Sequence, residues 1–113
     1  MTLQDLIKRN HEIWEYYVAS DIKRLGHEWP RGEYVRGLVG DVGALVKLTM
    51  GKDGLREIEN VDEKLAHELG DCFSCLLLIA EKYGIDPEKA FLDTMNELEA
   101  RGKKMDLARS HSL

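Results

Sequence analysis

The sequence has few cysteines, few prolines and no long apolar run, and each shortage excludes a class of protein. Two cysteines, Cys72 and Cys75, are too few for a disulfide-rich secreted domain. Two prolines leave long stretches without a helix breaker, which favours helices over a strand-rich fold. The longest apolar run, residues 75–80, is far shorter than the roughly 20 residues that a membrane-spanning helix needs. We therefore expect a helical protein with no membrane partner.

Basic residues are fewer than acidic ones, 16 against 21. The 113 residues carry a formal net charge of −5, so the protein should repel nucleic acid. The first ten residues lack the apolar run of a signal peptide, and we expect a cytoplasmic protein with reduced cysteines. A chain of this length fits one domain with a small core, so a second subunit often completes its cleft.

The apolar pattern predicts four helices, at about 2–19, 33–50, 62–83 and 86–101. Thr2 followed by Asp5 is a pattern typical of a helix start, and so is Asp86 followed by Pro87. Residues 1–104 are expected to form one helical domain, and residues 105–113 a flexible C-terminal tail. The predicted fold class is all-α, a four-helix bundle within one chain or shared between subunits.

Acidic residues occupy positions where a bundle places leucine. Asp41 falls in the apolar stripe of the second predicted helix, with Leu38, Leu45 and Leu48. Glu68 interrupts the stripe of the third helix in the same way, and Asp71 follows one turn later, so that both carboxylates can point at one place. Buried acids of this kind need a cation or a proton.

Two kinds of cation would satisfy these acids. Ion pairs with Lys47, Lys64 or Arg36 would be purely structural. Three inward-facing carboxylates from two helices instead favour a divalent metal, because Mg²⁺ prefers hard oxygen ligands. The Cys72-x-x-Cys75 pair lacks the further ligands of a zinc site and lies mid-helix, so we interpret both cysteines as core residues.

The acidic segments resemble those of a known family. Leu38-Val-Gly-Asp-Val-Gly-Ala-Leu45 and His67-Glu-Leu-Gly-Asp-Cys-Phe73 are similar to the two acidic helices of the all-α, MazG-like NTP pyrophosphohydrolases, whose signature is ExxE followed by ExxD. Glu68 and Asp71 match the second pair, while Asp41 and Ala44 replace the two glutamates of the first. The segment from Tyr83 to Phe91, with the later Asn96 and Arg101, is similar to the family's last helix.

This resemblance implies a MazG fold completed by oligomerisation, as a homodimer or homotetramer. It implies hydrolysis of a nucleoside triphosphate to a monophosphate and pyrophosphate, with Mg²⁺, or alternatively Mn²⁺, as cofactor. Glu68, Asp71 and Asp41 are the expected metal-binding and catalytic residues.

The expected substrate contacts lie outside the acidic segments. Lys47 and Arg101 would offset phosphate charge, and the resemblance adds Asn96. Trp14 is the candidate for stacking on the base. Because Ala44 supplies no ligand, the alternative is a degenerate relative that binds nucleotides or other proteins without turnover.

Overall fold

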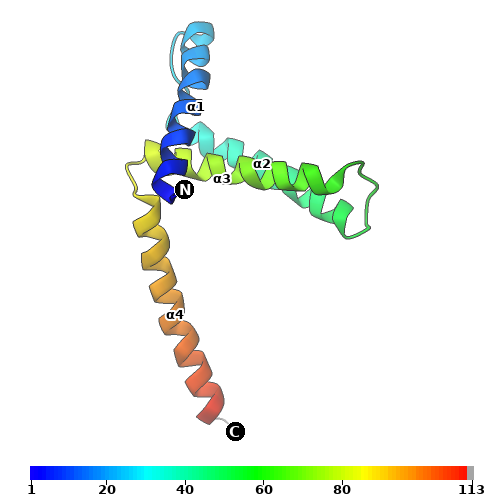
Figure 1. Cartoon of the computed structure of the whole chain (residues 1–113), viewed down its shortest axis with the longest axis vertical. Coiled ribbons are helices and arrows are strands. Elements are labelled where there is room, and N and C mark those ends of the chain that lie inside the picture. Colours follow the sequence, from blue (N-terminus) through cyan, green and yellow to red (C-terminus); the bar gives the residue numbers. More distant parts are fainter. Residues whose placement is uncertain (112–113) are drawn as a thin grey trace.

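The structure, a computed structural model, describes residues 1–111 and consists there of α-helices without a strand (Figure 1). The helices are α1 (Leu3–Leu25), α2 (Arg31–Lys52), α3 (Val61–Lys82) and α4 (Pro87–His111). The predicted all-α class is confirmed. No helix in the described range combines the length and the apolar character needed to cross a membrane.

Capping residues account for the predicted helix starts. The Thr2 side chain accepts a hydrogen bond from the Asp5 amide at 3.2 Å, and the Asp5 carboxylate accepts one from the Thr2 amide at 2.8 Å. At the start of α4, the Asp86 carboxylate accepts hydrogen bonds from the amides of Glu88 and Lys89 at 3.0 and 3.2 Å. Both predicted caps are confirmed.

Two helices continue past their predicted ends. α1 extends to Leu25, where Gly26 adopts a left-handed conformation with φ of 84° and closes the helix. α4 extends through residues 105–111, which the sequence analysis assigned to a tail, while residues 112–113 of that predicted tail lie outside the described residues. Ion pairs between residues one helical turn apart stabilise the longer α4. In one of them, a guanidinium nitrogen of Arg101 lies 2.7 Å from a carboxylate oxygen of Glu97.

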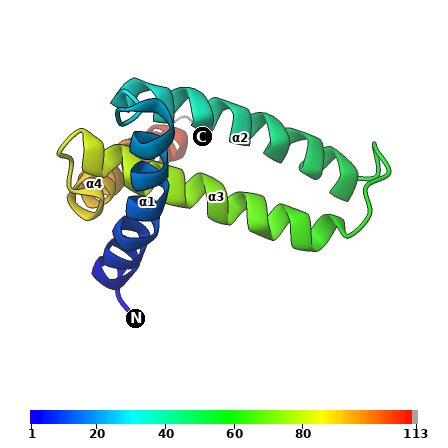
Figure 2. The ribbon, with the colours of Figure 1, turned by 90° about the horizontal axis from the view of Figure 1, so that it is seen from above.

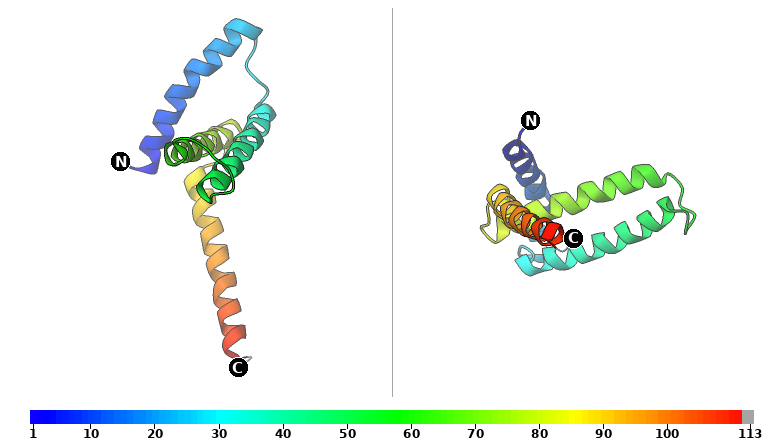
Figure 3. Two further views of the ribbon diagram at one scale, coloured as in Figure 1. Left: turned by 90° about the vertical axis from the view of Figure 1, so that its right-hand side faces the viewer. Right: turned by 90° about the horizontal axis from the view of Figure 1, so that it is seen from below.

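The helices are arranged around one antiparallel pair. α2 and α3 lie side by side, α1 crosses this pair near the end of α3, and α4 projects away from it (Figures 1 and 2). The radius of gyration is 18.7 Å, whereas a compact chain of this length has about 13 Å. The left view in Figure 3 shows the same open shape, with the C-terminal end of α4 far from the α2–α3 pair. One chain therefore does not close a four-helix bundle by itself.

The buried core of the described chain lies where α1, α2 and α3 meet. Its members are Tyr34, Cys72, Cys75, Leu77 and Leu78. Both cysteines are free and buried, so their predicted role as core residues is confirmed. The run at 75–80 is not enclosed on every side, because Leu76 is 52% exposed. A core this small leaves a functional site near the surface.

Candidate functional site

The acidic residues lie where the helical periodicity predicts. Leu38, Asp41, Leu45 and Leu48 are all half-buried along the α2 face that contacts α3. On α3, Glu68 is half-buried one turn before the buried Cys72. Asp41 and Glu68 therefore face each other across the helix pair, and Asp71 lies at its more exposed edge. We call Asp41, Glu68 and Asp71 the acid cluster.

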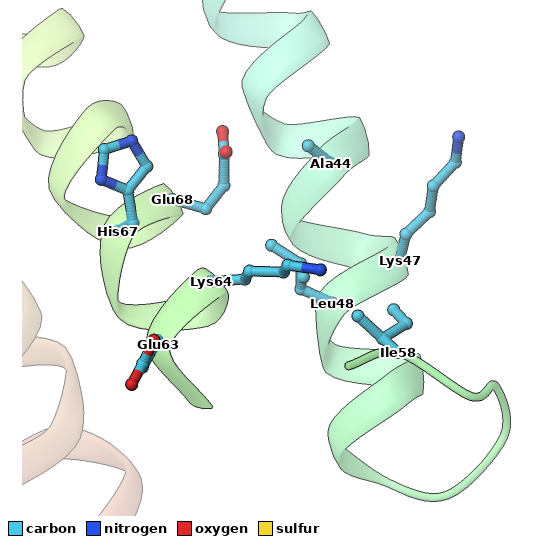
Figure 4. A pocket seen from close by; sticks show the side chains of 8 residues that line it. All are labelled: Ala44, Lys47, Leu48, Ile58, Glu63, Lys64, His67 and Glu68. Atoms are coloured by element: carbon cyan, nitrogen blue, oxygen red, sulfur yellow. The ribbon is translucent and has the colours of Figure 1, made fainter. Parts of the chain in front are cut away.

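Glu68 is the most perturbed member of the acid cluster. Its side chain points from α3 toward Ala44 of α2 (Figure 4). Burial raises the pKa of the Glu68 carboxyl, and the nearby charges of Asp41 and Asp71 and a side-chain hydrogen bond with Asp41 raise it further. Its Oε1 atom is buried and has no hydrogen-bond partner. A buried carboxylate oxygen without a partner favours the binding of a proton or of a cation.

Asp71 has a different neighbour. His67, one turn earlier on α3 and largely exposed, lies with Nε2 3.3 Å from an Asp71 carboxylate oxygen. The His67 side chain also lines the cavity that Glu68 lines (Figure 4). Within residues 1–109, no three His, Cys, Asp or Glu side chains are grouped closely enough to hold a metal ion in the observed conformation.

The ion pairs of the described residues do not neutralise the acid cluster with lysine or arginine. Arg36 pairs with Glu33 on its own helix at 2.8 Å. Lys47 and Lys64 line the same cavity as Glu68, yet neither lies within ion-pair distance of an acid of the cluster. The structural alternative based on these three cations is therefore not observed in the described chain.

An open cavity of about 650 Å³ lies beside Glu68, between α2 and α3. Ala44, Lys47, Lys64 and Glu68 are among its lining residues, and Ile58 from the α2–α3 loop closes one end (Figure 4). Ala44 exposes only a methyl group toward Glu68, so the fourth carboxylate of the expected signature is absent here. Figure 4 shows the Lys47 side chain extending away from Glu68, while the Lys64 side chain extends into the space between α3 and α2.

A second cavity, of about 400 Å³, joins the acid cluster to α1. We call it the aromatic cavity. Its lining comprises Trp14, Tyr17 and Asp21 of α1, Trp29 of the connection, Glu33, Tyr34, Gly37 and Asp41 of α2, and Asp71, Ser74 and Cys75 of α3. Aromatic side chains and two members of the acid cluster thus share one space, which suits a ligand with a flat ring.

Hydrogen bonds hold Trp14 in the wall of the aromatic cavity. Its indole Nε1 donates to Ser74 Oγ at 2.9 Å, and the Ser74 hydroxyl donates to Asn10 at 2.5 Å. The Trp14 ring meets the Tyr34 ring edge-on, with centroids 5.9 Å apart, and the Tyr17 ring at 5.6 Å. The structure therefore brings the predicted Trp14 together with Asp41 and Asp71.

Two predicted substrate contacts lie elsewhere. Asn96 and Arg101 are exposed on α4, which projects away from the α2–α3 pair (Figure 3), and Arg101 pairs with Glu97. Within one chain they do not reach the acid cluster. Asp21 and Glu33, which line the aromatic cavity, were not predicted as site residues. The spacing of Trp14, Tyr17 and Asp21 by three and four residues was the available signal, since it places them on one helix face.

Comparison of the chain with models of protein families, with curated proteins and with solved structures found no match. The functional interpretation therefore depends on the site itself. The acid cluster offers only carboxylate oxygens, the ligands that Mg²⁺ and Mn²⁺ prefer. The unpartnered Oε1 of Glu68 and the repulsion among the three acids match the chemistry of a bound divalent cation.

Proposed function

We propose that the protein is a metal-dependent nucleoside triphosphate pyrophosphohydrolase of the MazG-like type, which releases a monophosphate and pyrophosphate. The observation that carries this proposal is the aromatic cavity, because it places aromatic rings and the carboxylates of Asp41 and Asp71 in one space. Such a site offers one region for a base and another for phosphates bound with a metal.

Each part of the site has a distinct role in this proposal. Glu68, Asp41 and Asp71 would hold Mg²⁺ or Mn²⁺, and Lys47 would attract the phosphate chain. A bound divalent ion neutralises phosphate oxygens and acidifies water. Trp14, fixed by its hydrogen bond to Ser74, would stack on the base and so position the anhydride near the acids.

The test is the hydrolysis of a panel of ribo- and deoxyribonucleoside triphosphates with Mg²⁺ or Mn²⁺, with pyrophosphate and orthophosphate measured separately. We expect pyrophosphate release that Glu68→Ala abolishes and that Glu57→Gln, a change at an exposed loop acid, leaves intact. Orthophosphate as the first product, or equal activity in Glu68→Ala, would contradict the proposal.

Ala44 favours a second candidate, a nucleotide-binding module without turnover. It faces Glu68 where the expected signature has a glutamate, so the acid cluster has one carboxylate fewer (Figure 4). The same assay separates the two candidates. Inactive native protein that still binds nucleotide, with activity gained in Ala44→Glu, would identify the degenerate form.

We further propose that the protein acts as a homodimer or homotetramer that completes the bundle. Support comes from exposed apolar residues at helical spacing on three helices, which no other part of the described chain covers: Val35, Val39, Val42 and Val46 on α2, Leu69, Phe73 and Leu76 on α3, and Phe91, Met95, Leu98 and Met105 on α4. Sedimentation should show a dimer or tetramer, and a monomer at micromolar concentration would refute this.

A further inference from the structure

The aromatic cavity combines aromatic rings with acids and lacks basic side chains. Its described lining contains four aromatic residues, Trp14, Tyr17, Trp29 and Tyr34. It also contains four carboxylates, from Asp21, Glu33, Asp41 and Asp71, and no lysine, arginine or histidine. Aromatic faces and carboxylates both attract cations, so this lining favours a positively charged ring over a neutral one.

Two of these acids do not belong to the acid cluster. Asp21 of α1 lies with its side chain 19% exposed, and Glu33 of α2 with its side chain 33% exposed. Each accepts a bond from an arginine one turn away on its own helix, through Asp21 Oδ1 to Arg24 at 3.0 Å and Glu33 Oε1 to Arg36 at 2.8 Å. The second oxygen of each carboxylate has no such partner, which leaves one acceptor on each for a ligand.

Tyr34 adds an unpartnered polar group to the same wall. Its side chain is 8% exposed, and its hydroxyl has no hydrogen-bond partner in the described chain. Burial raises the pKa of this hydroxyl, the charge of Lys82 lowers it, and the charges of Glu28 and Asp21 raise it. A ligand with N–H donors at one ring edge would use the second carboxylate oxygen of Asp21.

We infer that the aromatic cavity selects a purine base that carries positive charge through alkylation of a ring nitrogen, such as 7-methylguanine, over the neutral base. The inference depends on the proposed function in taking the ligand to be a nucleotide. A cationic ring gains from stacking on Trp14 and Tyr17 and from the carboxylates of Asp21 and Glu33, while the guanine edge supplies N–H donors to a carboxylate. A neutral ring gains the stacking on the aromatic residues but not the attraction to the carboxylates.

The test compares 7-methylguanosine with guanosine, which differ by one methyl group and its charge. Binding to the full chain is followed by tryptophan fluorescence without divalent metal, at mildly acidic pH where the methylated ring keeps its charge. Neither nucleoside carries phosphate, so the result does not depend on hydrolysis. We expect 7-methylguanosine to bind about tenfold more tightly, the ratio expected when a cation–π contact and attraction to the carboxylates act together.

Variants connect this preference to the carboxylates. Asp21→Asn should reduce the preference to less than about threefold. Glu97→Gln is the matched control, because it removes an exposed acid that pairs with an arginine on α4, and it should leave the preference unchanged. Glu33→Gln replaces Asp21→Asn if thermal unfolding shows that the Asp21 variant is not folded.

Each outcome separates the inference from the proposed function. Equal affinity for the two nucleosides overturns the inference, as does hydrolysis of triphosphates without binding of either nucleoside. Displacement of 7-methylguanosine by tetramethylammonium at equal concentration would also overturn it, since the site would then recognise charge without a base. A preference for 7-methylguanosine that Asp21→Asn abolishes, in a protein with no pyrophosphate release, supports the inference while refuting the proposed enzyme.

Discussion

Replacing Glu68 by glutamine should stabilise the metal-free protein. Glu68 Oε1 is buried without a partner, and the charges of Asp41 and Asp71 disfavour ionisation of the carboxyl. Glutamine keeps the shape, removes the repulsion and offers an N–H donor to Asp41. An unsatisfied buried polar group costs about 1–3 kcal/mol, and the partial exposure of Glu68 places the gain near the lower end, at about 1 kcal/mol.

This gain corresponds to a rise in Tm of about 4 °C for a domain of this size, measurable by circular dichroism in a chelator. Mg²⁺ should raise the Tm of the native protein and should have little effect on Glu68→Gln, because the variant lacks one ligand. Glu57→Gln, at an exposed loop acid, should change stability by less than about 0.5 kcal/mol and keep the Mg²⁺ response. A Glu68→Gln protein that is less stable than the native one, with an unchanged Mg²⁺ response, would refute the reasoning.

Three further predictions follow from the packing and the charges. Ala44→Glu should raise the affinity for Mg²⁺ about tenfold in calorimetric titration, because it adds a carboxylate opposite Glu68, and unchanged affinity would place the metal elsewhere. Leu78→Ala should lower the free energy of unfolding by about 2–5 kcal/mol in urea, since Leu78 is 1% exposed, and a loss below about 1 kcal/mol would contradict its place in the core. His11 of α1 contacts Glu81 of α3 and lies 2.8 Å from Glu15, and the hydrogen bond and charge of Glu81 raise the pKa of its ring. The protonated His11 ring therefore stabilises the fold fully below the unfolded-state pKa of about 6.5, and this stabilisation is lost as pH rises through the higher folded-state pKa. The Tm of the native protein should fall over that pH range, and the Tm of His11→Gln should fall less.

The helices and the acid cluster were predictable because they depend on local signals. Thr2 with Asp5, and Asp86 with Pro87, define helix starts through contacts within one turn. The periodicity of Leu38, Asp41 and Leu45 likewise determines which face of α2 is covered. The end of α4 was less predictable, because Gly102 signals a helix end, while the ion pairs Arg101–Glu97 and Lys103–Glu99 on either side of it support a continuing helix.

The aromatic cavity was not predictable from local signals, because it forms where three helices and a connection meet. Trp14 and Ser74 are 60 residues apart in the sequence and are joined by one hydrogen bond, which no periodic pattern encodes. Asp21 and Glu33 were omitted because each fits an ordinary surface pair with an arginine one turn away. Their position in the cavity depends on the angle at which α1 crosses α3.

The acid cluster also connects stability to ligand binding. Three carboxylates beside a small core destabilise the metal-free chain, because the helix pair that buries Glu68 also brings Asp41 close to it. A bound cation would reverse the sign of this interaction, since each acid then contributes attraction instead of repulsion. Asp41 and Asp71 also line the aromatic cavity, so a ligand that carries positive charge into that cavity should relieve part of the same repulsion. Metal and cationic base would therefore each reduce the stabilisation available to the other, and the Tm shift with both present should be smaller than the sum of the separate shifts.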